Sequence, residues 1–427
     1  MIGITTKKAP TPLTVVPYFA GSSLSFLIFG IFFFFVNDKH ELVYLQPKII
    51  ALTHIATLGI ITMMTMGTLH QFVPVVFNTN LRFEKLAFRN FFIFIFSLTF
   101  FIISFYTNSY FNYLIIAASM VAISIWIFIF NILATYLKAK KHDIAITFIL
   151  TSLLWLFLTT IYGLLQAYNF KYSFLGLDIL KYLKIHIIFG LAGWLLLLII
   201  GISSIIIPMF LISHRYVNKE KLKYIYSFIN AGIISAWISY QVYETEILNF
   251  LSWLFVIIGI FIYISYIYQS FKFKKKKLDI AMKHVLTAFI FLIVPIIFSI
   301  FIFFSENLDY NYFFSEIAIF YIFSILFGVY INLILGITYK TLPFIVWLYK
   351  YQKHLGKRKV PKPEQLYYKK TGHIQFYLYI SMLILIFAGL LLNKEYLLNI
   401  SAILMLLSAT LFNINVFTII FRTNPYK

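Results

Sequence analysis

The chain of 427 residues has no cysteine and little charge. Because no thiol is present, disulfides, thiolate metal sites, iron–sulfur clusters and cysteine nucleophiles are all excluded. Charged side chains make up only 11% of the chain, less than half the share in an ordinary soluble domain. That is too little polar surface for a soluble fold of this size, and the opposite of a disordered composition. The composition therefore predicts a membrane protein with many spans.

Several catalytic patterns are also missing. The sequence has no glycine-rich phosphate loop, no His-Glu-x-x-His and no nucleophile elbow. It has no paired acids inside an apolar run, since Asp309 and Glu316 lie at or beyond the edge of one. Ion-coupled transporters usually need a buried carboxylate, so this absence counts against a coupled transporter.

What the chain does contain is apolar runs long enough to cross a bilayer as helices, which takes about 20 residues each. We count twelve and predict an all-α polytopic membrane protein with twelve transmembrane helices. The runs cover residues 13–36, 48–77, 88–106, 110–137, 142–168, 180–213, 222–242, 247–271, 280–304, 314–348, 374–393 and 396–421.

The excess of basic residues, a net charge of +21, follows this helix count. If both termini lie on one side, that side holds 29 of the 35 Lys and Arg residues and the other side holds six. Basic loops mark the cytoplasmic side. The pattern predicts a multi-pass protein of a cell inner membrane with both termini in the cytoplasm. The charge indicates orientation in the lipid bilayer, and no nucleic-acid partner is expected.

A threefold repeat accompanies the spans. The second, sixth and tenth runs each contain an apolar residue followed by proline, and the prolines are 134 and 135 residues apart. Each proline is preceded by two glycines, seven and fifteen residues earlier. The triplets are Gly59, Gly67 and Pro74, then Gly193, Gly201 and Pro208, then Gly328, Gly336 and Pro343. Asp143-Ile144-Ala145 and Asp279-Ile280-Ala281 repeat with a similar offset.

We therefore predict one membrane domain, residues 1–427, built from three parallel four-helix pseudo-repeats at 13–137, 142–271 and 279–421. On an α-helix, glycines eight apart are about 80° past two full turns, so they would mark one broad packing face. The prolines are expected to end the three helices.

Histidine is the one ionisable residue type that is well placed for chemistry. His54 and His186 lie 20 and 22 residues before the prolines of equivalent helices, where the third helix has Phe323 and Tyr321. Neutral imidazole commonly ligates metals and haem iron. A histidine near a helix end can equally form a hydrogen bond at the membrane interface, and both interpretations stay open. His70 and His284 are expected to make polar contacts near helix ends.

This pattern resembles subunit I of the haem-copper oxidase and nitric oxide reductase superfamily. The matching residues are His54, Gly67 and Val73-Pro74 on the second helix, with Gly336 and Leu342-Pro343 on the tenth. The resemblance implies three arcs of four helices with the second, sixth and tenth helices inside. It also implies a low-spin haem whose axial ligand is at about the place of His54.

The sequence departs from that family at the other ligands. Where the family has His-x-His on the tenth helix, this chain has Tyr321-Ile322-Phe323. The seventh run, where the family has a His-His pair for copper, has no histidine. His186 is on the sixth helix but nearer its start. A complete binuclear centre for oxygen or nitric oxide reduction is therefore not expected.

These observations give a leading hypothesis and an alternative. The leading hypothesis is an oxidase-like membrane protein that binds at most one b-type haem or copper, with His54 and His186 as ligands. It would act in electron transfer or in redox or small-gas handling with a respiratory complex or electron donor. The alternative is a cofactor-free permease or a protein that binds a lipophilic ligand. Whether the chain is an enzyme is left open.

Overall fold

A computed structural model describes residues 8–36, 46–107, 113–139, 143–242, 245–304, 311–357 and 359–422. The described residues are mostly helical and include no strand. Eleven of the helical stretches are long and apolar enough to span a membrane. The prediction of an all-α polytopic membrane protein is therefore confirmed.

The predicted count of twelve spans is not confirmed, because the run at 222–242 differs from the others. It forms helix α9, Glu220–Gln241, but this helix is not among the eleven. Its first turn carries Glu220, Lys221 and Lys223, and polar residues continue along it. The twelfth span stays a prediction.

The chain divides into two compact units. The first unit contains residues 1–9, 72–83 and 109–277, and the second contains 10–71, 84–108 and 278–427. The main helices of the first unit are α5 (Tyr113–Tyr136), α6 (Ile144–Tyr172), α7 (Ile179–Ile188), α8 (Leu197–Leu211), α9 and α10 (Glu246–Lys272).

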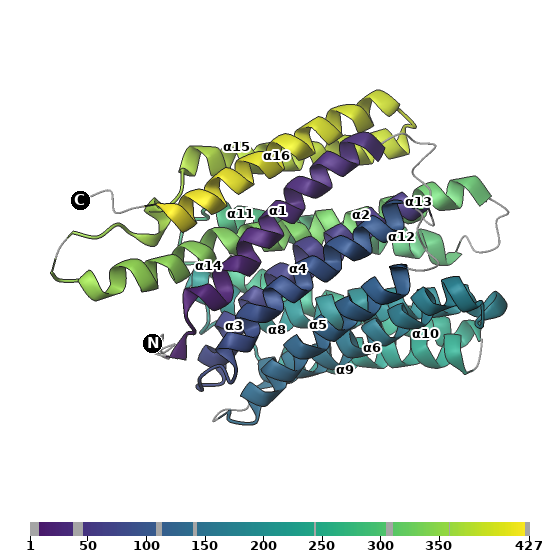
Figure 1. Ribbon diagram of the computed structural model, residues 1–427, viewed down its shortest axis with the longest axis horizontal. Coiled ribbons are helices and arrows are strands. Elements are labelled where there is room, and N and C mark those ends of the chain that lie inside the picture. The colour runs from purple at the N-terminus through teal and green to yellow at the C-terminus, as the bar shows by residue number, and fades with distance from the viewer. Residues whose placement is uncertain are drawn as a thin grey trace. The chain divides into compact units, whose positions relative to one another are not determined.

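The second unit contains most of the remaining helices. They are α1 (Pro12–Val36), α2 (Pro47–His54), α3 (Met63–Val76, whose last residues are counted with the first unit), α4 (Glu84–Tyr106), α11 (Ile280–Phe291), α12 (Ile293–Phe304), α13 (Asn311–Phe323), α14 (Asn332–Tyr351), α15 (Lys369–Leu391) and α16 (Glu395–Phe421). In this unit α1, α15 and α16 run side by side (Figure 1). Asn413 of α16 donates to the Ser23 carbonyl of α1 at 2.7 Å, which ties these two helices together.

A π-helical segment of eight residues interrupts each of the three glycine-bearing helices. The segments are η2 (Ile55–Thr62), η4 (Phe189–Leu196) and η5 (Ser324–Ile331). Their first residues are separated by the same 134 and 135 residues as the prolines. π-Helical segments are rare, so three at equivalent positions agree with the repeat found in the sequence. The boundaries of the pseudo-repeats stay a prediction.

Each of these three helices packs its glycines against one partner helix, α1, α6 or α11, which opens the corresponding predicted pseudo-repeat. A Cβ atom on Gly67 would lie 2.7 Å from Tyr18, one on Gly201 2.8 Å from Phe148, and one on Gly336 2.7 Å from His284. The other glycine of each pair, which comes eight residues earlier in the sequence, faces the residue seven positions further along the partner helix. These contacts join Gly59 to Ser25, Gly193 to Trp155 and Gly328 to Phe291.

The π segments correct the expected angle between the glycines. The two glycines of each pair are eight residues apart, whereas the partner residues that they face are seven apart. Two regular α-helices would not bring both contacts into register. A π turn takes in roughly one more residue than an α turn, so the π segment absorbs the extra residue. Both glycines consequently face one partner helix, as the predicted packing face requires. The offset of about 80° assumed α geometry throughout, and π winding reduces it.

The prediction that the prolines end these helices was wrong. Pro74 and Pro208 lie inside helices that continue to Val76 and Leu211, and α14 continues past Pro343 to Tyr351. A proline inside a membrane helix is tolerated because neighbouring groups satisfy the carbonyl that loses its donor.

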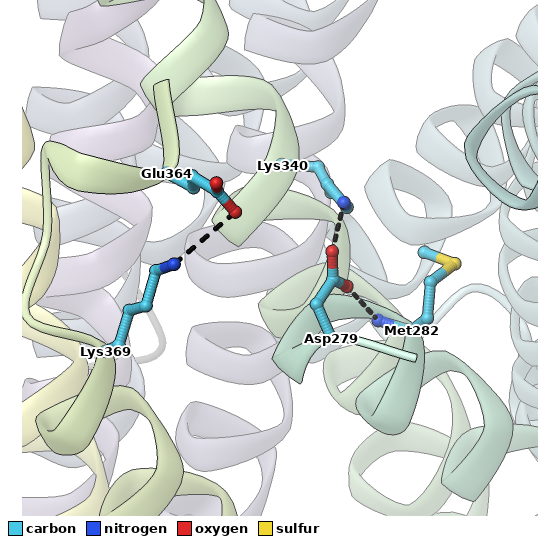
Figure 2. A network of polar contacts seen from close by, with 5 residues as sticks. All are labelled: Asp279, Met282, Lys340, Glu364 and Lys369. Atoms are coloured by element: carbon cyan, nitrogen blue, oxygen red, sulfur yellow. Dashed lines mark hydrogen bonds and ion pairs between the residues drawn. The ribbon is translucent and has the colours of Figure 1, made fainter. Parts of the chain in front are cut away.

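A capped and paired aspartate holds the start of α11 in the second unit. One carboxylate oxygen of Asp279 accepts a hydrogen bond from the Met282 backbone N–H at 3.2 Å. The other oxygen forms an ion pair with Lys340 of α14, and a second pair, Glu364 with Lys369, is shown with it in Figure 2. Asp279 thus links the start of α11 to α14 within the second unit.

Replacing Gly193 by alanine should destabilise the protein more than replacing Gly190. A Cβ on Gly193 would lie 2.6 Å from Trp155, whereas one on Gly190 would meet Thr159 at 3.4 Å, an ordinary contact. Both glycines lie in η4, so the intrinsic effect of replacing glycine by alanine in a helix should be the same at the two positions. Overpacking costs about 1–3 kcal/mol. The melting temperature of Gly193→Ala in detergent should fall by several degrees relative to Gly190→Ala, and equal values would contradict this packing.

Two substitutions at Asp279 should separate its two interactions. Asp279→Asn keeps an oxygen that caps the helix, while Asp279→Ala loses both the cap and the ion pair. Loss of an N-cap typically costs about 1 kcal/mol. The melting temperatures should therefore rank wild type, Asp279→Asn and Asp279→Ala from highest to lowest. Identical values for the two variants would show that the cap contributes nothing.

Candidate functional site

His54 is the last residue of α2 and directly precedes the π segment η2. Its Nδ1 lies 2.8 Å from the Ile50 carbonyl oxygen, one turn earlier. The ring contacts Phe101 edge to face at 5.1 Å and is stacked on Phe105 at 5.9 Å, both from α4. A backbone carbonyl and two phenyl rings therefore fix the orientation of this imidazole.

His186 lies on α7, three residues before the π segment η4. Its Nδ1 lies 2.9 Å from the carbonyl oxygen of Thr159 on α6. One turn further along α6 is Gly163, where a Cβ atom would lie 3.0 Å from Cε1 of the ring. The sequence at Gly163 thus leaves room for the imidazole to lie close to α6.

The end of the first unit near His186 is aromatic and polar. Trp237 donates to the hydroxyl of Tyr162 at 2.9 Å, and that hydroxyl donates to Gln241 at 3.2 Å. The Tyr162 ring also packs edge to face on Phe189, the first residue of η4, at 5.4 Å. These contacts connect α6 with α9 and hold the part of α6 against which His186 lies.

The two histidines share one tautomer. A carbonyl oxygen can only accept, so Nδ1 carries the proton in both rings and Nε2 is the acceptor nitrogen of the neutral imidazole. Histidines that bind metal or haem iron almost always donate their other N–H to a carbonyl, a carboxylate or water. Both rings therefore have the donor chemistry expected of nitrogen ligands. His54 belongs to the second unit and His186 to the first.

The third glycine-bearing helix has aromatic residues at the matching positions. Phe323 ends α13 directly before η5, as His54 ends α2 before η2. The Phe323 ring is stacked on Phe327 at 4.4 Å. This helix offers no imidazole there. Among the described residues, no group of three or more His, Cys, Asp and Glu side chains is arranged to hold a metal ion.

His70 and His284 are both fully buried in the second unit. The His70 ring packs 5.2 Å from that of Tyr18. His284 lies within hydrogen-bonding distance of Asn332 at 2.6 Å and of Gln375 at 3.2 Å. The expected polar contact of His284 near a helix end is confirmed, since it is the fifth residue of α11. The sequence did not reveal that this contact is part of a buried polar network.

Sequence reasoning missed Asn332 and Gln375, which are buried with His284. The residue type of Asn332 and Gln375 is the sequence feature that could have identified them, since side-chain amides are uncommon in the middle of long apolar runs. Buried polar groups in membrane helices pair with one another. The sequence does not reveal which polar residues pair, because Asn332 and Gln375 are 48 and 91 residues away from His284.

Neither a protein-family model nor a curated protein matches this sequence. Among solved structures, the chain is similar to a heme-copper terminal oxidase whose dimer was determined by cryo-electron microscopy. The identity is 10%, the alignment covers 97% of this chain and 85% of that chain, and the TM-score is 0.70. At this identity the likeness shows a shared fold. The chain is thus a multi-pass membrane protein with an oxidase-like fold.

Proposed function

We propose that this protein binds at most one haem or metal ion, with His54 and His186 as its candidate ligands, and acts in electron transfer or in redox or small-gas handling. The observation that carries this proposal is the shared tautomer of the two imidazoles. In each, Nδ1 is bound to a backbone carbonyl, at 2.8 Å for His54 and 2.9 Å for His186. The lone pair is thereby assigned to Nε2.

The residues around each histidine would serve to position it. Phe101 and Phe105 fix the plane of the His54 ring, and Gly163 lets His186 approach α6. Folding already fixes the orientation of these side chains, so an incoming iron or copper would meet rings that need no further ordering. When bound, haem or copper would supply one-electron redox chemistry.

A single cofactor is favoured over a binuclear centre by the other expected ligand positions. The third glycine-bearing helix offers Tyr321 and Phe323, and α9 contains no histidine. Oxidases of this superfamily need histidines at both places. The fold of the neighbour supports a redox role, and a respiratory complex or an electron donor is the partner we propose.

Purified protein should show a Soret absorption band or contain iron or copper at about one equivalent. His54→Ala and His186→Ala should abolish the band, because each removes a nitrogen ligand. His214→Ala is the matched control, since His214 is exposed in the turn that follows α8, and its spectrum should equal that of the wild type. Adding imidazole to His54→Gly should restore part of the band if the variant is folded.

Two outcomes would refute the proposal. Pure protein with neither a Soret band nor a stoichiometric metal would leave the cofactor-free permease or lipophilic-ligand binder as the better hypothesis. An unaltered spectrum in both alanine variants would show that the cofactor is held by other residues.

We further propose that the protein lies in a cell inner membrane with both termini in the cytoplasm. The basic turn after α10, which includes Lys274 to Lys277, should then be cytoplasmic, and the turn at Ser173 should be on the opposite side. A fluorescent protein inserted after Lys275 should fluoresce, and one inserted after Ser173 should not, whereas alkaline phosphatase should show the opposite pattern. The reverse result would overturn this orientation.

A further inference from the structure

His284 lies in a buried polar network within the second unit that the proposed redox site does not use. It belongs to α11 and is the residue against which Gly336 packs. Its ring is fully buried. Three polar residues around it are buried too: Asn332, the first residue of α14, Gln375 of α15 and Ser408 of α16. Equivalent contacts in the other pseudo-repeats are made by Tyr18 and Phe148, so only the third has an ionisable nitrogen base here.

One side of the network is fixed by a backbone carbonyl. Nδ2 of Asn332 donates to the Gly328 carbonyl oxygen at 3.3 Å. A carbonyl can only accept, so this bond determines which end of the Asn332 amide faces His284. Oδ1 of Asn332 consequently lies 2.6 Å from Nδ1 of His284. An oxygen at that position needs a proton on Nδ1.

The opposite side is fixed by the backbone of Tyr368. Oδ1 of Asn415 accepts from the Tyr368 N–H at 3.1 Å, and its Nδ2 donates to the Tyr368 carbonyl at 3.4 Å. The same Nδ2 donates to the Tyr339 hydroxyl at 3.4 Å. The Tyr339 hydroxyl is therefore left to donate its own proton onward, and it lies 3.3 Å from Oε1 of Gln375.

Ser408 orients Gln375 in the same sense. Its hydroxyl donates to the Gln375 carbonyl at 3.4 Å and accepts from Nε2 of Gln375 at 3.0 Å. Oε1 of Gln375 thus faces both Tyr339 and Nε2 of His284, the latter at 3.2 Å. This second oxygen needs a proton on Nε2.

Both ring nitrogens of His284 therefore face acceptors, and a neutral imidazole has only one N–H. We propose that His284 is a proton-binding site inside the membrane, in which the ring takes up a proton from water and is held as an imidazolium by the amide oxygens of Asn332 and Gln375. The bound ligand is the proton itself. In the neutral ring, the lone pair of one nitrogen faces a lone pair of an amide oxygen, and the added proton turns this contact into a hydrogen bond.

Burial opposes this charge, since a cation loses its hydration there. Two charge-assisted hydrogen bonds offset that loss. The aromatic rings of Phe376 and Tyr379 pack edge to face with the imidazole, with ring centroids 4.8 and 5.9 Å away. No carboxylate pairs with His284 among the described residues, so the amide oxygens supply most of the compensation.

The other titratable groups near the ring belong to α11, η5, α14, α15 and α16 and to the residue before α11. Tyr339 of α14 and Tyr379 of α15 are the tyrosines in ring contact with it. Lys283 lies on α11 itself, and Asp279, the residue that caps α11, is paired with Lys340 of α14. The remaining titratable residues of the packed elements are Tyr330 in η5, Lys350, Tyr349 and Tyr351 in α14, Lys369, Lys370, His373 and Tyr377 in α15, and Glu395 and Tyr396 in α16; α12 contains none.

Loss of the proton would disturb the network. A neutral His284 requires one amide to turn so that its NH₂ faces the ring. If Asn332 turns, its oxygen faces the Gly328 carbonyl and the bond to η5 is lost. If Gln375 turns instead, the hydrogen bond from its Nε2 to Ser408 is lost. Either change removes a hydrogen bond that holds an amide of the network in place.

Nitrogen NMR of histidine-labelled protein in lipid bilayers tests the site directly. The His284 signals are those absent from His284→Gln. At pH 7 we expect both ring nitrogens to have the shifts of N–H groups. In Asn332→Leu one acceptor is gone, so the proton affinity should fall roughly tenfold or more and one nitrogen should become unprotonated.

Two further variants provide controls. Asn332→Asp keeps an oxygen acceptor and adds negative charge, so both nitrogens should stay protonated. Asn230→Leu removes a half-buried amide of the other unit, which accepts from Trp155, and should leave the His284 signals unchanged. If His284→Gln fails to fold, the signals that respond to Asn332→Asp serve for assignment. An unprotonated His284 nitrogen in the wild type at pH 7 would overturn the proposal and show that the Gln375 amide is turned.

Discussion

The close approach of each glycine-bearing helix to the helix that opens its pseudo-repeat is the contact on which the rest of the structure depends. Lipid tails are as apolar as leucine, so helices in a bilayer associate through tight packing and not through burial from water. At Gly67, Gly201 and Gly336 even one methyl group would overlap the partner helix. Maintaining two such contacts on one face requires the extra residue that each π segment accommodates.

The π segments also bear on the candidate ligands. His54 stands at the last α-helical position before η2, and the matching position before η5 is Phe323. A change from α to π winding alters the direction in which neighbouring side chains point. Chemistry at these positions can consequently differ between the three pseudo-repeats while the packing of their backbones stays the same. The same holds for Tyr18, Phe148 and His284, which occupy one packing position with three different chemical groups.

Much of this architecture was predictable from local patterns. The spans, the repeat spacing and the paired glycines are visible because each depends on residues close together in sequence, such as Gly193, Gly201 and Pro208. The π segments were not predictable, since hydrophobic periodicity over eight residues is too short to separate α from π winding. The His284 network was missed for another reason. Its geometry depends on residues from four helices, and on backbone groups of Gly328 and Tyr368 that have no sequence signature.

The three π segments also make the chain sensitive to changes in length. A π turn takes in roughly one more residue than an α turn. Deleting one residue within η2, η4 or η5 would therefore favour regular α winding there, and the two glycines of that helix could no longer both face their partner residues. Such a deletion would disturb the packing without removing any of the contacting side chains.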